Sequence, residues 1–223
     1  MRTRTSWRFL VLLIVGLLAT GCEGTVPFGG LRGSGDLITE SRPVGGFDEI
    51  VVLGSGNVVV DVDGSESLEI EAEDNIIEFL TTEVVNGRLE LGVESGKLLS
   101  PSRDITYTIT ASQLKAVTIN GSGNIAATGI DTDTFEVTIS GSGDVEPAGT
   151  SNHLQVTISG SGRFDGTALE SATGDVEVSG SGNVVVNVTD ELTVRVSGSG
   201  DVEYIGDPNL NSRVSGSGDI SRR

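Results

Sequence analysis

The most regular chemistry in this sequence belongs to seven carboxylate or amide side chains, each placed directly after a Gly-Ser-Gly tripeptide. The tripeptide occurs eight times, and only one copy is followed by another type of residue, Arg163. Oxygen atoms of Asp and Asn hydrogen-bond nearby backbone in turns and can also bind cations. We therefore take the seven residues as a candidate exposed row: Asp36, Asn57, Asn124, Asp144, Asn183, Asp201 and Asp219.

A calcium ladder and a catalytic serine are two specific sites that such a repeat could form. Gly-Ser-Gly-Asp is similar to the calcium-binding repeat Gly-Gly-x-Gly-x-Asp, but its spacing is about twice that of a nonapeptide. Each serine lies directly between glycines, unlike the serine of a Gly-x-Ser-x-Gly nucleophile elbow. The single histidine, His153, cannot activate eight serines, and we expect it in an ordinary loop. We predict no metal, no cofactor and no catalytic residue, with calcium binding as an alternative.

Acidic residues keep a second alternative open, a carbohydrate-active enzyme on a β-helix fold. Such enzymes use paired acids, and Asp61, Asp63, Glu69, Glu71 and Glu73 are close in sequence. With 32 acidic residues in the chain, however, close pairs arise readily by chance. The sequence therefore favours a non-enzymatic protein.

The first 22 residues have the pattern of a bacterial lipoprotein leader. A basic start precedes an apolar run from Phe9 to Leu18, which is too short to span a bilayer. Leu18-Ala19-Thr20-Gly21-Cys22 then resembles a lipobox, and Cys22 is the only cysteine. We predict a signal peptide at 1–21, lipidation of Cys22 and a tether at 22–30, with a plain secretory peptide as the alternative. Glu23 favours sorting to an outer membrane, on its periplasmic or exposed side.

The net charge limits the partners that the protein can bind. The whole chain carries −18, and removal of residues 1–21 leaves 11 basic against 32 acidic residues, a net charge of −21. Such a surface repels nucleic acid and anionic lipid headgroups. We predict no nucleic-acid partner, and contact with the membrane only through the N-terminal lipid.

Apolar residues at fixed distances from the tripeptide predict the elements that position the row. The last six copies are 20, 19, 20, 18 and 18 residues apart, with apolar and polar residues alternating around them. Such a repeat predicts stacked β-helix coils whose equivalent residues lie above one another, with glycine at each bend. The earlier copies have the same register, with Leu31 and Val52 before and Leu37 and Val58 after. In the last six copies the inward residues are Ile119, Ile139, Ile158, Val178, Val196 and Val214 before, and Ile125, Val145, Phe164, Val184, Val202 and Ile220 after.

The pattern is interrupted from Leu68 to Arg103, which predicts an irregular insertion in the N-terminal half. Residues 68–72 alternate as a strand, and residues 74–80 are compatible with one helical turn. Asn86-Gly87 between apolar runs predicts a hairpin. Residues 95–103 follow as a loop, and residues 105–110 as another strand.

With these motifs in view, the chain resembles the putative auto-transporter adhesin, head GIN domain family over about residues 31–220. The resemblance includes Phe47-Asp48-Glu49-Ile50, the serial Ser-Gly-Ser-Gly-Asp/Asn copies, and the closing segment from Val202 to Pro208. It implies an all-β domain at 31–223, a single-stranded right-handed parallel β-helix on a secreted or lipid-anchored protein. We expect an adhesion or scaffold module of the cell envelope whose ligand is an envelope or extracellular protein or a glycan. An envelope stress or signalling accessory is a further alternative.

Overall fold

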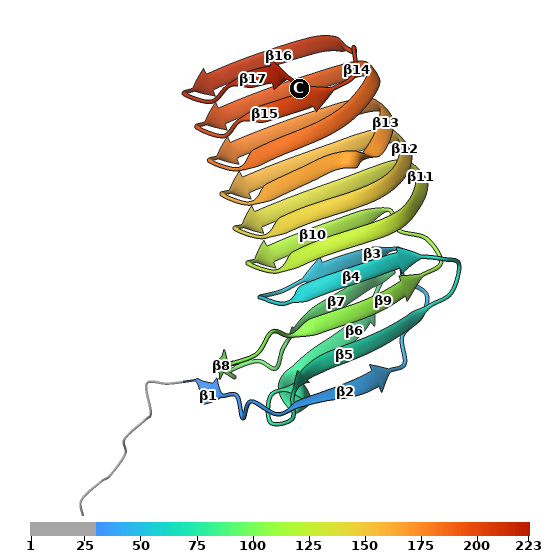
Figure 1. Cartoon of the computed structure of the whole chain (residues 1–223), viewed down its shortest axis with the longest axis vertical. Helices are drawn as coiled ribbons and strands as arrows, with labels where there is room; N and C mark the ends of the chain where they lie inside the picture. Colours follow the sequence, from blue (N-terminus) through green and yellow to red (C-terminus); the bar gives the residue numbers. More distant parts are fainter. Residues whose placement is uncertain (1–29) are drawn as a thin grey trace, which may run out of the picture.

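The computed structural model describes residues 30–223 and confirms the predicted all-β solenoid, a flattened stack of parallel coils on a base of shorter strands (Figure 1). The predicted leader and Cys22 lie outside the described residues. No helix within 30–223 is long and apolar enough to cross a membrane. Four long strands form the coils: β11 (Asn124–Gly141), β12 (Asp144–Gly160), β13 (Arg163–Gly180) and β14 (Asn183–Gly198).

Shorter strands extend the two faces of the stack at both of its ends. At one end these strands form part of the base. Toward the base lie β3 (Glu49–Val52), β4 (Asn57–Val62) and β10 (Ala116–Gly121). At the other end lie β15 (Val202–Ile205), β16 (Asn209–Gly216) and β17 (Ile220–Arg222).

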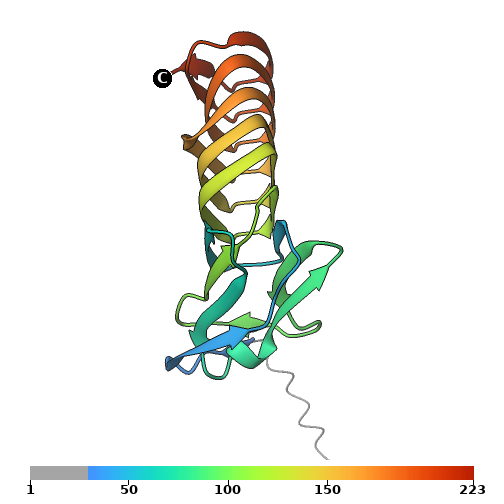
Figure 2. The same ribbon diagram turned by 90° about the vertical axis from the view of Figure 1, so that its right-hand side faces the viewer.

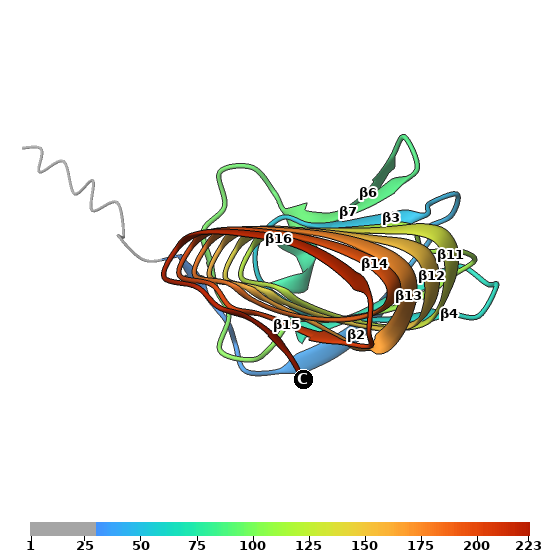
Figure 3. The same ribbon diagram turned by 90° about the horizontal axis from the view of Figure 1, so that it is seen from above.

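Stacked apolar residues form one continuous core, as the register predicts, except that Val214 in the last coil has no further coil to cover it and is 41% exposed. Ile119 pairs with Ile139, Ile139 with Ile158, and the valines of β13 and β14 continue the column. Ile119, Ile139 and Ile158 are fully buried. Seen from above, the coils have a similar outline and are each offset slightly from the next (Figure 3). Because each side chain packs on its equivalent in the next coil, the core is built from repeated apolar columns.

The corner glycines are required for two different reasons. Gly141 has φ +148°, and a Cβ at this position would overlap the carbonyl oxygen of Gly121 in the preceding coil. That same oxygen accepts a hydrogen bond from the Ser142 N–H at 2.9 Å. In the corners from Gly123 onward the second glycine is needed for space instead: a Cβ on Gly182 would lie 2.7 Å from both the Gly162 oxygen and the Ile158 Cγ2. The positive φ and the close packing between coils both require the first glycine, and close packing alone requires the second.

The unequal coil lengths are absorbed away from the Gly-Ser-Gly corners. Pairing between β11 and β12 shifts between Ala127 and Ile130, and pairing between β12 and β13 shifts between Val145 and Ala148. The corners themselves stay in register, because Gly141 pairs with Gly160. Extra residues therefore bulge out of individual strands without disturbing the stack.

The predicted insertion is present, and it leaves the stack uninterrupted. Ser122 N–H donates to the Gly54 carbonyl at 2.9 Å, so two corners 67 residues apart in sequence are neighbours in space. The hairpin is confirmed, with positive φ at Asn86 and Gly87, and the helical turn is a short 3₁₀ helix. The loop contains one two-residue strand. The elements of the insertion are β5 (Ser67–Glu73), η1 (Ile77–Phe79), β6 (Leu80–Val85), β7 (Arg88–Val93), β8 (Leu99–Ser100) and β9 (Thr106–Ala111).

The register expected for the first tripeptide copy is wrong. β1 (Leu31–Arg32) pairs with β8, and β2 (Leu37–Arg42) runs antiparallel to β5. Leu31 and Leu37 are consequently 40% and 45% exposed. The tripeptide itself contacts the segment at Asp74 and Asn75. The Ser34 N–H donates to Asn75 Oδ1, and the Ser34 hydroxyl donates to Asp74 Oδ1. This copy has no coil on which it could stack as a corner.

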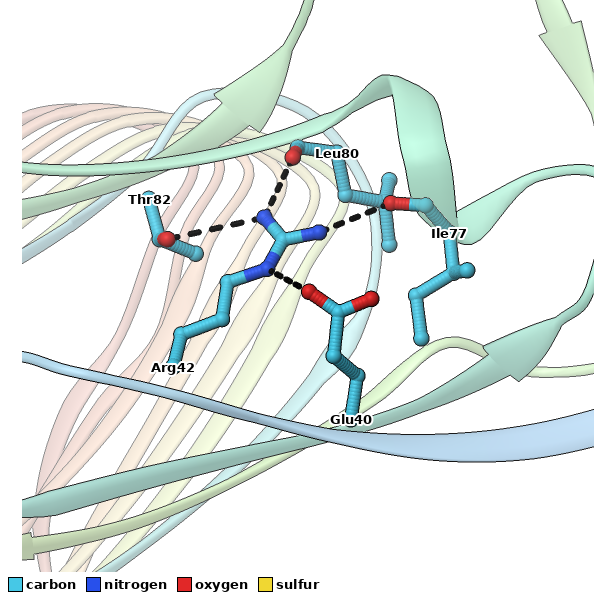
Figure 4. A network of polar contacts seen from close by, with 5 residues as sticks. All are labelled: Glu40, Arg42, Ile77, Leu80 and Thr82. Carbon is cyan, nitrogen blue, oxygen red and sulfur yellow. Dashed lines mark hydrogen bonds and ion pairs between the residues drawn. The ribbon is translucent and has the colours of Figure 1, made fainter.

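One arginine closes the base of the molecule, where β2 and β6 are the last strands of the two faces (Figures 2 and 4). The Arg42 guanidinium of β2 donates to the Leu80 carbonyl at 2.5 Å and to the Ile77 carbonyl at 2.8 Å, and its Nε pairs with Glu40 Oε1 at 2.8 Å. An inward-pointing charge on an edge strand discourages pairing with another chain. Arg42 therefore links the two faces and occupies backbone acceptors at the open end of the core.

We predict that Gly141→Val lowers the free energy of unfolding by more than about 2 kcal/mol, because a β-branched residue is strained at this φ and its Cβ overlaps the neighbouring coil. Chemical denaturation followed by circular dichroism measures the loss. Ser142→Ala, at the exposed residue of the same corner, is the matched control and should change stability by no more than about 0.5 kcal/mol. Equal stability of the two variants would contradict this account of the corner.

Candidate functional site

Six of the seven predicted row residues form a continuous column along the axis. Asn57 pairs with Asn124, and Arg163 lies in register between Asp144 and Asn183. Asp36 is the exception and corrects the prediction: it lies in the base, where its carbonyl oxygen accepts a hydrogen bond from the Asp74 N–H at 2.9 Å. The column therefore has one end at Asn57, beside the base, and the other at Asp219.

Much of this column is engaged in hydrogen bonds between coils. The Asp144 N–H donates to Asn124 Oδ1 at 3.2 Å, and the Asp219 N–H donates to Asp201 Oδ1 at 2.9 Å. The Asp201 N–H donates in the same way to Asn183 Oδ1. The side-chain oxygens thus satisfy backbone donors of the next coil, which is a structural role. Within residues 30–223, no three acidic, histidine or cysteine side chains come together in a way that could hold a metal ion.

The column ends beside the insertion at a cleft of about 300 Å³. Asn124 Nδ2 donates to Asn57 Oδ1 at 3.1 Å, so Asn57 is the last member of the ladder. Its backbone N–H donates to the Ile105 carbonyl at 2.8 Å, whereas its side-chain Nδ2 donates to no other residue of the described chain. Asn57 lines the cleft together with Arg103 and Asp104. The full lining is Ser55, Gly56, Asn57, Pro101, Ser102, Arg103, Asp104, Ile105, Ser122 and Asn124. The cleft therefore combines amide, hydroxyl, guanidinium and carboxylate groups on two walls from distant parts of the sequence.

A buried carboxylate holds the wall of the cleft that comes from the insertion. Glu73 is 1% exposed, and it accepts hydrogen bonds from the Ser102 hydroxyl at 2.5 Å, the Ser102 N–H at 2.9 Å and the Gly35 N–H at 2.7 Å. The Ser102 hydroxyl is the main cause that holds the pKa of Glu73 below its ordinary value, against the opposing effect of burial. Glu73 therefore ties the 95–103 loop to the first tripeptide copy.

Sequence reasoning missed this role of Glu73. Alternation places Leu68, Ile70 and Ala72 inward, so Glu73 is expected on the solvent side of β5. The loop and the Gly33–Gly35 segment cover it from outside, and a Cβ on Gly33 would overlap its carboxylate. Its hydrogen-bond partners, Gly35 and Ser102, lie about 30 residues or more away in the sequence. The local residue pattern around Glu73 therefore cannot predict these contacts.

The expectation that His153 lies in a loop is also wrong. It belongs to β12, because the long strand continues around the wide bend opposite the corner. Its Nδ1 is 2.9 Å from the Thr173 hydroxyl, and its Nε2 is 3.5 Å from Asp175 Oδ2. The ring thus contacts the next coil and lies outside the cleft.

Comparison with known proteins agrees with this architecture. The putative auto-transporter adhesin, head GIN domain family matches residues 46–208. A putative adhesin from Bacteroides fragilis NCTC 9343 superposes with a TM-score of 0.73 at 23% identity, covering 87% of this chain and 100% of that chain. A putative lipid binding protein from Parabacteroides distasonis ATCC 8503 gives 0.58 at 22% identity, with 86% and 99% covered. A putative adhesin from Parabacteroides merdae ATCC 43184 gives 0.56 at 17% identity, with 86% and 98% covered. No curated protein matches the chain.

We predict that the 95–103 loop loosens in acid because Glu73 becomes protonated. The folded-state pKa is lowered, so the stabilisation is complete above the ordinary value of 4.5 and is lost as the pH falls through the lower folded value. The Ser102 amide resonance, followed by NMR from pH 7 downward, should report the transition. Glu73→Gln should remove the pH dependence of this resonance, whereas Glu71→Gln on the exposed side of β5 should leave it unchanged. The same titration in Glu73→Gln and in the unmodified protein would refute the assignment.

Proposed function

Because the chain belongs to the putative auto-transporter adhesin, head GIN domain family, we propose that it is a lipid-anchored, non-catalytic binding protein of the bacterial cell envelope. The anchor is Cys22, at the end of the predicted leader. In this role the folded body carries the recognition site, and the lipid keeps the body in the envelope. The cleft at Asn57 is the observation that carries the proposal.

The direction of the chain supports an anchored role. Residue 30 and β1 lie at the base, whereas the C-terminus lies at the opposite end of the stack (Figure 1). The eight residues from Cys22 to Gly30 extend at most about 26–29 Å. A lipid on Cys22 would therefore keep the base near the membrane.

The chemistry of the cleft favours binding over catalysis. Asn57, Arg103 and Asp104 supply donors and acceptors that suit the hydroxyl and carboxylate groups of a glycan. Among the residues that line the cleft, Asp104 is the only carboxylate, whereas glycoside hydrolysis ordinarily uses two. We therefore propose a glycan as the ligand class, bound without turnover, in preference to the carbohydrate-active enzyme.

The anchor is tested by Cys22→Ser expressed in a bacterium with lipoprotein processing. The unmodified protein should sediment with membranes and the variant should be soluble, because the acyl chains are attached through this residue. Metabolic labelling with a fatty acid should mark only the unmodified protein. Continued sedimentation of the variant would overturn the proposed anchor.

The cleft is tested with a panel of acidic and neutral polysaccharides. A ligand found there should bind about tenfold more weakly to Arg103→Ala and to Asn57→Ala, since a hydrogen bond to a charged or polar group contributes about 1–3 kcal/mol. Calorimetry measures the affinity, and chromatography of the polysaccharide detects turnover. Arg195→Ala, an exposed arginine outside the cleft, is the control and should bind normally. Unchanged binding by both cleft variants, or cleavage of the ligand, would contradict the proposal.

A further inference from the structure

The base of the molecule presents an apolar side chain that the fold leaves uncovered. Leu98 is 78% exposed, the highest value among the large exposed hydrophobic residues of the described chain. Leu31, whose strand pairs beside it, is 40% exposed. We call Leu31, Lys97 and Leu98 the base patch. Single exposed hydrophobic residues are ordinary on a protein surface, but these two leucines lie on paired segments, and Leu98 is far more exposed than the other large apolar side chains of the described chain.

The backbone of the base patch is fixed by its neighbours. The Leu31 N–H donates to the Leu98 carbonyl at 2.7 Å, and the Gly33 N–H donates to the Ser100 carbonyl at 3.1 Å. Leu99, the next residue, packs against the hydrophobic core. The fold therefore partly buries Leu99, holds the chain on both sides of it, and leaves the side chain of Leu98 exposed.

The charges around the base patch differ from those of the chain as a whole. Lys97 precedes Leu98, and its Nζ lies 4.2 Å from the centre of the Phe79 ring. Arg32 follows Leu31, although Glu94 lies in the same turn as Lys97. In a chain with a net charge of −21 after removal of residues 1–21, a point with two nearby cations can approach lipid phosphates with less repulsion than the rest of the surface.

The point at which the N-terminal tether joins the body favours a membrane as the surface that contacts the base patch. A Cβ on Gly30 would lie 2.6 Å from the Leu98 carbonyl oxygen, so the segment that leads back to Cys22 leaves the body directly at the patch. Eight residues allow at most about 26–29 Å between the two, which keeps the patch at a high effective concentration near the bilayer. A second copy or a soluble partner has no comparable constraint that places it here.

We infer that Leu98 and Leu31 insert into the interfacial region of the membrane and hold the solenoid upright on it. The inference rests on the proposed anchor at Cys22. The lipid supplies the attachment, and the base patch supplies a second point of contact that fixes the orientation. Without that contact the body would pivot freely on its tether.

A tryptophan reporter tests the contact. Trp7 is the only tryptophan of the sequence and lies in the predicted leader, so Leu98→Trp in the lipidated mature protein gives a single emission. Val214→Trp, at a 41% exposed residue of β16 at the opposite end, is the matched control. Both proteins are reconstituted in phosphatidylcholine vesicles with and without brominated acyl chains. We expect emission from position 98 to shift to shorter wavelength and to lose most of its intensity to bromine, with neither change at position 214.

Flotation of the vesicles separates the two proposals. If the protein floats with the vesicles and position 98 is neither shifted nor quenched, the contact is refuted while the anchor stands. If the protein does not float, both the anchor and the contact fail. Shift and quenching at both positions would mean that the body lies flat on the membrane, which also refutes the upright orientation.

Discussion

The structure depends on one close approach, the carbonyl oxygen of a corner glycine lying against the α-carbon of the equivalent glycine in the next coil. At Gly121 and Gly141 this leaves no space for a Cβ, and the serine N–H that follows closes the contact with a hydrogen bond. The approach fixes the corners in register from coil to coil. Because the corners are in register, every equivalent position along the coils is aligned as well. This includes the apolar columns, the Asn/Asp ladder and the exposed rows of both faces.

The sequence predicts the features that the repeat itself determines, such as the register of the coils. It predicts few contacts between residues that are far apart in the sequence. Ile139 and Ile158 lie where the period places them, and the Asn86-Gly87 hairpin forms from local chemistry. The first tripeptide copy looks like the others, yet the segment at Asp74 and Asn75 occupies it in place of a coil. Glu73 shows the same limit, because its burial depends on two loops that join only in three dimensions.

The candidate site could be predicted in part for the same reason. Position after the corner correctly predicts the column from Asn57 to Asp219, because a fixed period aligns those residues. The pattern does not distinguish oxygens that satisfy the next coil from groups that remain available. That difference arises at Asn57, where the ladder ends against a wall from the insertion. In this chain the cleft thus forms where the repeat is interrupted, and it is there that we propose the ligand binds.

The stacking of Gly54 on Gly121 has a consequence for how such proteins diversify. The two corners meet as if they were consecutive, although 67 residues separate them, because closing a longer loop adds only a logarithmic entropy penalty. A coil can thus accept a sizeable new segment at its open side without a change in its neighbours. The number of coils would set the length of the body, and the size of a single enlarged coil would set the local surface.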